Sequence, residues 1–145
     1  MLPPEKLPDE LGELIAIQQL IASYALAIDQ RDYDRVAACF AEDAEVTYAG
    51  VELPAGRAPI RAWLEAHSDF VASTHLLAPP VVELDGDRAR TVTSAVAFLV
   101  REGRLHTRGL LYTDEMERRD GRWLIVRRVH EALWEATQPA ETAPK

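Results

Sequence analysis

A chain of 145 residues has the length of one domain, and its formal net charge of -8 argues against the basic surface that a nucleic-acid-binding protein needs. A hydrophobic share of 48% and a charged share of 28% are those of a globular protein, and no apolar run approaches the roughly 20 residues of a membrane span. The single cysteine, Cys39, excludes an intrachain disulfide and a multi-cysteine zinc site. The acidic, proline-rich residues 1–10 do not resemble a targeting segment, so a cytoplasmic location is expected.

Three helices are predicted in the first half of the chain. The longest follows residues 7–10, which carry helix start signals, and its apolar side chains keep helical spacing up to Ile28. A shorter helix is expected within residues 31–40 and a third within residues 55–70. Between these two, the alternating residues 44–50 are typical of a strand.

The second half of the chain is predicted to form consecutive hairpins, because turn dipeptides interrupt long alternating segments. Strands are predicted near residues 73–84, 88–101, 105–118 and 122–134. The fold class is therefore α+β, with helices packed on one face of a bent antiparallel sheet. The domain is expected to span residues 1–134, and residues 135–145 are expected to form a flexible tail because they lack apolar periodicity.

Alternation also sorts the strand residues by face. One face of the strand 105–118 carries His106, Arg108, Leu110, Tyr112 and Asp114, and one face of the strand 88–101 carries Thr91, Thr93, Ala95, Ala97 and Leu99. A row of small residues beside a row of polar ones is what a ligand-sized hollow requires. Alternatively, Ala95 and Ala97 only allow the long helix to approach the sheet closely.

Asp29 and His75 are the candidate acid-base residues. Asp29 closes the apolar run of the long helix, where a carboxylate gains from a hydrogen-bond donor because it opposes the helix dipole. A carboxylate that binds one imidazole nitrogen raises the basicity of the other, which makes His75 a candidate general base. The simpler alternatives are a solvated turn for Asp29 and a core position for His75.

Tyr24 lies roughly 140° from Asp29 around the helix, so both share a pocket only if it is wide or the helix bends.

No nucleophile motif, phosphate loop or dinucleotide fingerprint occurs, so proton transfer without a cofactor is the simplest chemistry. The remaining histidines, His67, His106 and His130, show no metal-ligand spacing, and no metal site is predicted.

The segments "YALAIDQRDYDRVAACFAEDAEVTYAG", "STHLL" and "YTDEMERRDGRWLIVRR" resemble the SnoaL-like branch of the nuclear transport factor 2-like superfamily. The likeness is strongest to scytalone dehydratase and the bile acid 7α-dehydratases, and it covers residues 11–134. It implies a strongly curved sheet that forms a cone-shaped pocket under the helices. It further implies a homodimer, or a trimer, with a small hydrophobic molecule as ligand.

The same resemblance implies roles for individual residues. His75 falls at the acid-base position and Asp29 at the position of its orienter, while Tyr48 and Tyr24 match tyrosines of the dehydratase sites. The expected substrate-binding residues are Tyr112, His106, Leu99, Leu110 and Trp63. The sequence departs from scytalone dehydratase at Leu99, where that enzyme has a second histidine, and at Leu110 and Tyr112, where it has serine and asparagine.

The activity expected from the resemblance is that of a cofactor-independent dehydratase, a lyase acting on a small cyclic, polyketide-like or steroid-like hydroxy-carbonyl substrate. An isomerase or cyclase would use the same base without a leaving hydroxyl, and a binding or dimerisation module would use no base. The patterns of ketosteroid isomerase and limonene epoxide hydrolase fit this sequence less well.

Overall fold

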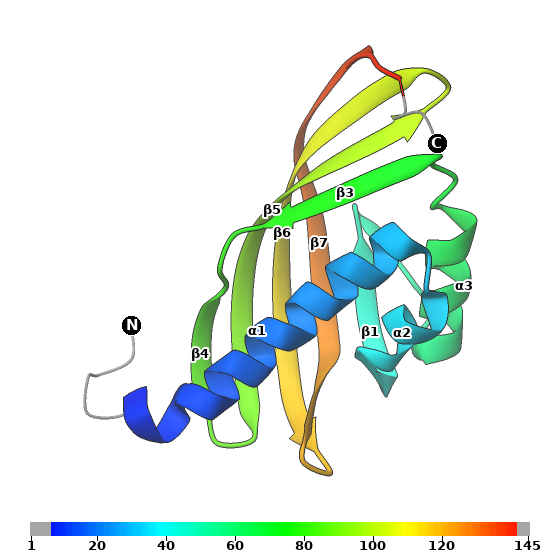
Figure 1. Ribbon diagram of the computed structural model, residues 1–145. Helices are drawn as coiled ribbons and strands as arrows, with labels where there is room; N and C mark the ends of the chain where they lie inside the picture. Colours follow the sequence, from blue (N-terminus) through cyan, green and yellow to red (C-terminus); the bar gives the residue numbers. More distant parts are fainter. Residues whose placement is uncertain (1–6, 142–145) are drawn as a thin grey trace.

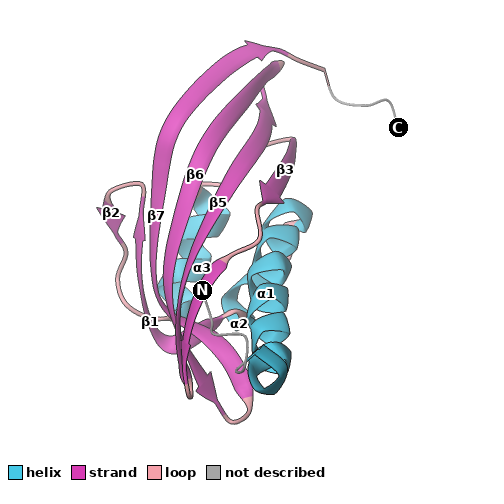
Figure 2. Ribbon diagram, turned by 90° about the vertical axis from the view of Figure 1, so that its left-hand side faces the viewer, coloured by secondary structure: helices cyan, strands magenta, loops and turns pink. Residues whose placement is uncertain are grey.

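The computed structural model describes residues 7–141 of the chain. Three helices precede or interrupt the first strands, namely α1 (Leu7–Gln30), α2 (Tyr33–Ala38) and α3 (Arg57–Ala66). The strands are β1 (Phe40–Tyr48), β2 (Val51–Glu52), β3 (Ala72–Leu77), β4 (Val81–Asp85), β5 (Arg88–Arg101), β6 (Arg104–Arg119) and β7 (Arg122–Pro139). The α+β class is confirmed, with the helices on the concave side of a curved sheet (Figures 1 and 2).

The seven strands form one sheet in the order β2-β1-β7-β6-β5-β3, and β4 pairs with the other end of β5. All pairs are antiparallel except β1 with β7, which run parallel. The hairpin between β6 and β7 turns at Asp120 and Gly121, which both have positive φ as a tight two-residue turn requires. The predicted hairpins of the second half are confirmed.

Two predicted strand boundaries are corrected. The expected strand 73–84 is divided into β3 and β4, because residues 78–80 include two prolines that cannot donate to a ladder. β7 continues to Pro139, since it pairs with the whole of β6 up to the partners Arg104 and Pro139. The tail expected from residue 135 is therefore strand at first, and residues 142–145 lie outside the described residues.

The long helix α1 packs against the inner face of the sheet through Ile17, Ile21, Tyr24 and Ile28, all buried. Its segment Glu10–Gln30 is long and apolar enough to cross a membrane by length and composition, which corrects the expectation that no such run exists. Core helices of globular proteins meet the same criterion, and the buried face of α1 is part of the hydrophobic core. The end of α1 lies beside β3, which brings Asp29 to the sheet (Figure 1).

Candidate active site

Asp29 and His75 form a hydrogen-bonded pair at the junction of α1 and β3. Oδ1 of Asp29 lies 2.7 Å from Nδ1 of His75, and Oδ2 accepts the backbone N–H of His75 at 2.7 Å. The hydroxyl of Ser73 donates to Oδ1 at 2.9 Å. The Asp29 carboxylate thus accepts three bonds from one strand, which fixes both the end of the helix and the imidazole ring.

The electrostatics of the pair favour an ionised Asp29. Burial alone would raise the pKa of this carboxyl, but the hydrogen bonds from the side chain and backbone of His75, with that from Ser73, lower it below its usual value. An acceptor carboxylate places a proton on Nδ1 of His75 and leaves Nε2 as the basic nitrogen. The side chain of His75 is only 7% exposed and lines a cavity.

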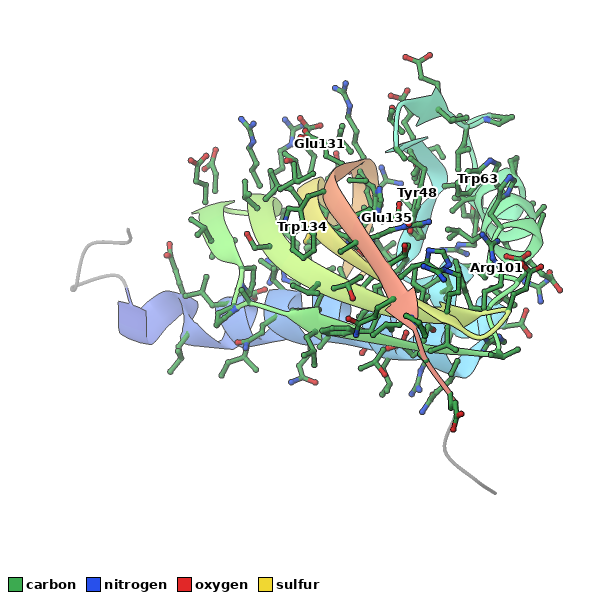
Figure 3. The ribbon with its side chains drawn as sticks, turned by 90° about the horizontal axis from the view of Figure 1, so that it is seen from above. Tyr48, Trp63, Arg101, Glu131, Trp134 and Glu135 are labelled. Atoms are coloured by element: carbon green, nitrogen blue, oxygen red, sulfur yellow. The ribbon has the colours of Figure 1, made fainter. Side chains whose placement is uncertain are left out.

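The cavity has a volume of about 270 Å³ and lies between the end of α1, α3 and the inner face of the sheet. In Figure 3 its surroundings are seen end-on, with Tyr48 of β1, Trp63 of α3 and Arg101 of β5 converging from separate elements. Its lining consists of Ile28, Arg31, Tyr48, Ala49, Trp63, Leu64, His67, Ser68, Phe70, Ser73, His75, Ala97, Leu99, Arg101, Arg108, Leu110, His130 and Ala132. Most of these side chains are apolar or aromatic, as expected for a site that holds a small organic molecule.

The register of the sheet builds the floor of this cavity. His75, Ala97, Arg108 and Glu135 are successive partners across β3, β5, β6 and β7. Ala97 is small and buried, so the space above it lies between His75 and Arg108. The predicted face assignment is confirmed, since Ala97, Leu99, Arg108 and Leu110 all line the cavity.

Tyr48 and His130 form the far wall. Their rings stack with centroids 3.9 Å apart, and the ring of Trp63 lies 4.8 Å from that of Tyr48, centroid to centroid. Burial, with the nearby charge of Arg128, lowers the pKa of His130 to about 4, so this histidine is neutral at physiological pH. Burial also raises the pKa of Tyr48, whose phenol keeps its proton and can donate a hydrogen bond.

A buried ion pair supports this wall from behind. Arg128 donates from Nε and an Nη atom to the two oxygens of Asp114 at 2.7 and 2.8 Å, and neither side chain is exposed. The guanidinium lies 4.2 Å from the ring centroid of Tyr24 and 4.5 Å from that of Tyr112. The pair therefore packs against two aromatic rings of the core and helps to hold their arrangement.

The predicted site residues separate into two groups. His75, Tyr48, Trp63, Leu99 and Leu110 line the cavity, and Asp29 binds His75 directly. Tyr24 and Tyr112 lie in the core beside Arg128, and the hydroxyl of Tyr24 has no hydrogen-bond partner among residues 7–141. His106 approaches Glu135 at 3.1 Å and does not line the cavity. These three residues thus lie outside the cavity to which they were assigned.

Other lining residues are not among the predicted site residues, mainly His130 and three arginines, Arg31, Arg101 and Arg108. Alternation places Arg108 on the same predicted strand face as Leu110, and this signal is enough to add it to the predicted site residues. No signal in the sequence assigns His130 to the site, because its position opposite Tyr48 depends on the parallel pairing of β1 and β7, which local patterns do not reveal. Across the described part of the chain, no cluster of His, Cys, Asp or Glu could hold a metal ion.

Comparison with known proteins places the chain in a family. An uncharacterized protein of Mycobacterium tuberculosis is 34% identical over 125 residues, which cover 83% of this chain and 85% of that protein. Two solved structures share the fold. A hexachlorocyclohexane dehydrochlorinase of Novosphingobium barchaimii has 22% identity and a TM-score of 0.84, with 94% of this chain and 98% of that chain covered. A scytalone dehydratase-like protein of Novosphingobium aromaticivorans has 23% identity and a TM-score of 0.80, with 92% and 91% covered.

The profile of the SnoaL-like domain matches residues 9–129, most of the chain. The resemblance found in the sequence is therefore confirmed, and the chain belongs to the SnoaL-like domain family of the nuclear transport factor 2-like superfamily.

Proposed function

We propose that this protein is a cofactor-independent lyase that eliminates water from a small hydrophobic hydroxy-carbonyl compound. The observation that carries the proposal is the bond between Asp29 and Nδ1 of His75 on the wall of a cavity. A buried carboxylate and imidazole in that arrangement act as a general base and then as a general acid. Elimination needs both steps on neighbouring carbon atoms, which one imidazole can perform.

In the proposed reaction, Nε2 of His75 takes a proton from the carbon next to the substrate carbonyl. Asp29 stabilises the imidazolium that results, because its ionised carboxylate accepts a hydrogen bond from the Nδ1–H group of His75. The carbon-hydroxyl bond then breaks, and His75 returns a proton to the departing hydroxyl, which leaves as water. A carbon-carbon double bond forms, and the enzyme ends in its starting protonation state.

The negative charge that develops on the carbonyl oxygen needs hydrogen-bond donors. Tyr48 is suitable because its raised pKa keeps the phenol protonated. His130 lines the same wall, and its neutral imidazole offers one N–H donor and one acceptor nitrogen. Neither ring has freedom to turn away, since they stack on one another.

The structural neighbours support elimination as the reaction class. Two of them are named as a dehydrochlorinase and a scytalone dehydratase-like protein, and both names denote loss of a small molecule from neighbouring carbons. The mostly apolar lining of the pocket suits a small hydrophobic substrate, and the sequence contains no nucleophile motif that would favour a different reaction.

The test is a screen of hydroxy-carbonyl compounds by mass spectrometry, followed by kinetics of Asp29→Asn and His75→Asn. A lyase releases water from a substrate, and each variant is expected to lower kcat by about 10²- to 10⁴-fold. Asp34→Asn is the matched control, because that carboxylate is 89% exposed and pairs with Arg61 instead of His75. A product of unchanged mass would indicate an isomerase or cyclase instead. Full activity in both variants would contradict the proposal.

A further inference from the structure

Arginines are the charged side chains that line the cavity directly, and no carboxylate among the described residues lines it. The lining contains three arginines, together with three histidines of which His130 is neutral at physiological pH. The whole chain has the opposite character, with a formal net charge of -8. A cationic cavity in an acidic protein favours a ligand that carries negative charge.

We propose that the ligand of this cavity carries a carboxylate group and that Arg108 binds it. The proposal rests on the proposed function for the reacting end of the ligand, and it adds the chemical class of the other end. It concerns recognition, so it can be tested by binding alone, without turnover.

Arg108 is placed to bind a group at the opposite end of the cavity floor from His75. The two side chains flank Ala97, whose small side chain leaves the intervening space open. The buried Nε of Arg108 has no hydrogen-bond partner among residues 7–141, although Oε2 of Glu135 lies 3.4 Å away. A buried donor without a partner has a free-energy cost that a ligand oxygen would remove. A guanidinium fork fits a carboxylate with two parallel bonds.

The other two arginines are held by neighbouring groups. Arg101 donates to Asp69 at 3.0 Å, and Arg31 donates to the backbone carbonyl of Phe70. Both arginines line the cavity, and Arg108 is the arginine on its floor. The body of the ligand would contact apolar and aromatic surfaces, because Trp63 and Phe70 lie in the same lining.

A substitution at Glu135 provides a second test, in which anion binding should become stronger instead of weaker. Its carboxylate lies near both Arg108 and His106, at 3.4 and 3.1 Å, and it offsets part of the charge that a ligand would meet. Removing that charge in Glu135→Gln should strengthen the binding of an anion. Removing the guanidinium in Arg108→Gln should weaken it.

The experiment compares 2-naphthoate with 2-naphthamide, two probes of nearly the same shape that differ in charge, by isothermal titration calorimetry. We expect the carboxylate to bind about tenfold or more tightly, which corresponds to one charge-assisted contact. This preference should disappear in Arg108→Gln, increase in Glu135→Gln, and stay unchanged in Arg90→Gln, which removes one exposed arginine elsewhere on the sheet.

Equal binding of the two probes, or no binding of 2-naphthoate, would overturn the proposal. A preference that survives in Arg108→Gln would overturn the role of that residue. If the protein prefers the carboxylate but releases no water from any substrate, the binding inference holds and the proposed reaction is contradicted. If the protein releases water but shows no preference for the carboxylate, the proposed reaction holds and the binding inference is contradicted.

Discussion

His130 should remain uncharged down to about pH 4, and the protein should lose stability in acid because the buried imidazole resists protonation. Burial, with the nearby positive charge of Arg128, lowers its pKa to about 4, whereas an unfolded chain has a value near 6.5. The difference of about 2.5 pH units corresponds to about 3 kcal/mol, at about 1.4 kcal/mol per unit. Because the unfolded state binds the proton more readily, the free energy of unfolding should fall as pH decreases from about 6.5 to about 4.

The assay is urea-induced unfolding at steps from about pH 8 to about pH 3.5 for the wild type and His130→Phe. Phenylalanine keeps a ring against Tyr48, which stacks on His130 at 3.9 Å, and it cannot bind a proton. The variant should therefore lose about 3 kcal/mol less than the wild type across this range. His67→Phe, which removes an exposed imidazole, should behave as the wild type. Identical losses for the wild type and His130→Phe, or an NMR titration of His130 near pH 6.5, would refute this reasoning.

The buried ion pair predicts that Asp114→Ala lowers the free energy of unfolding by about 3–5 kcal/mol, because Arg128 is left charged and fully buried. Chemical denaturation should show most of that loss recovered in the double variant Asp114→Leu with Arg128→Met, and an unrecovered loss would contradict the desolvation argument. Gly109→Ala would place a Cβ atom 2.1 Å from Nε1 of Trp134, so the indole must move. A red shift of tryptophan emission with a stability loss of about 1 kcal/mol is expected, and an unchanged spectrum would contradict the contact.

Local patterns were sufficient to predict most of the secondary structure. The turn dipeptides located the hairpins, and helical spacing located α1, because these signals depend on residues close in sequence. Alternation sorted Ala97 and Arg108 onto one face without coordinates, since the period of a strand is fixed. The pairing of Asp29 with His75 was expected only through the family resemblance, as the two residues lie on elements far apart in the chain.

Interactions between distant segments account for what the sequence did not predict. Tyr24 lies on the core side of α1 beside Arg128, consistent with its angular separation from Asp29 around the helix. The position of His130 against Tyr48 follows from a parallel strand pair with a long connection, which no periodicity encodes. The extension of β7 depends on the length of its partner strand, because the last residues gain hydrogen bonds only where β6 continues beside them.

The register that places His75 and Arg108 on either side of Ala97 also sets the length that the proposed ligand would have to span. The two residues stand on strands separated by one other strand, so their backbones lie about 10 Å apart, two inter-strand spacings of about 4.8 Å each. That separation is set by backbone hydrogen bonds and cannot adjust to a shorter molecule. A ligand that reaches both side chains, as proposed, would have to match this spacing within the reach of the imidazole and the guanidinium, and much of the selection by length would then come from the sheet.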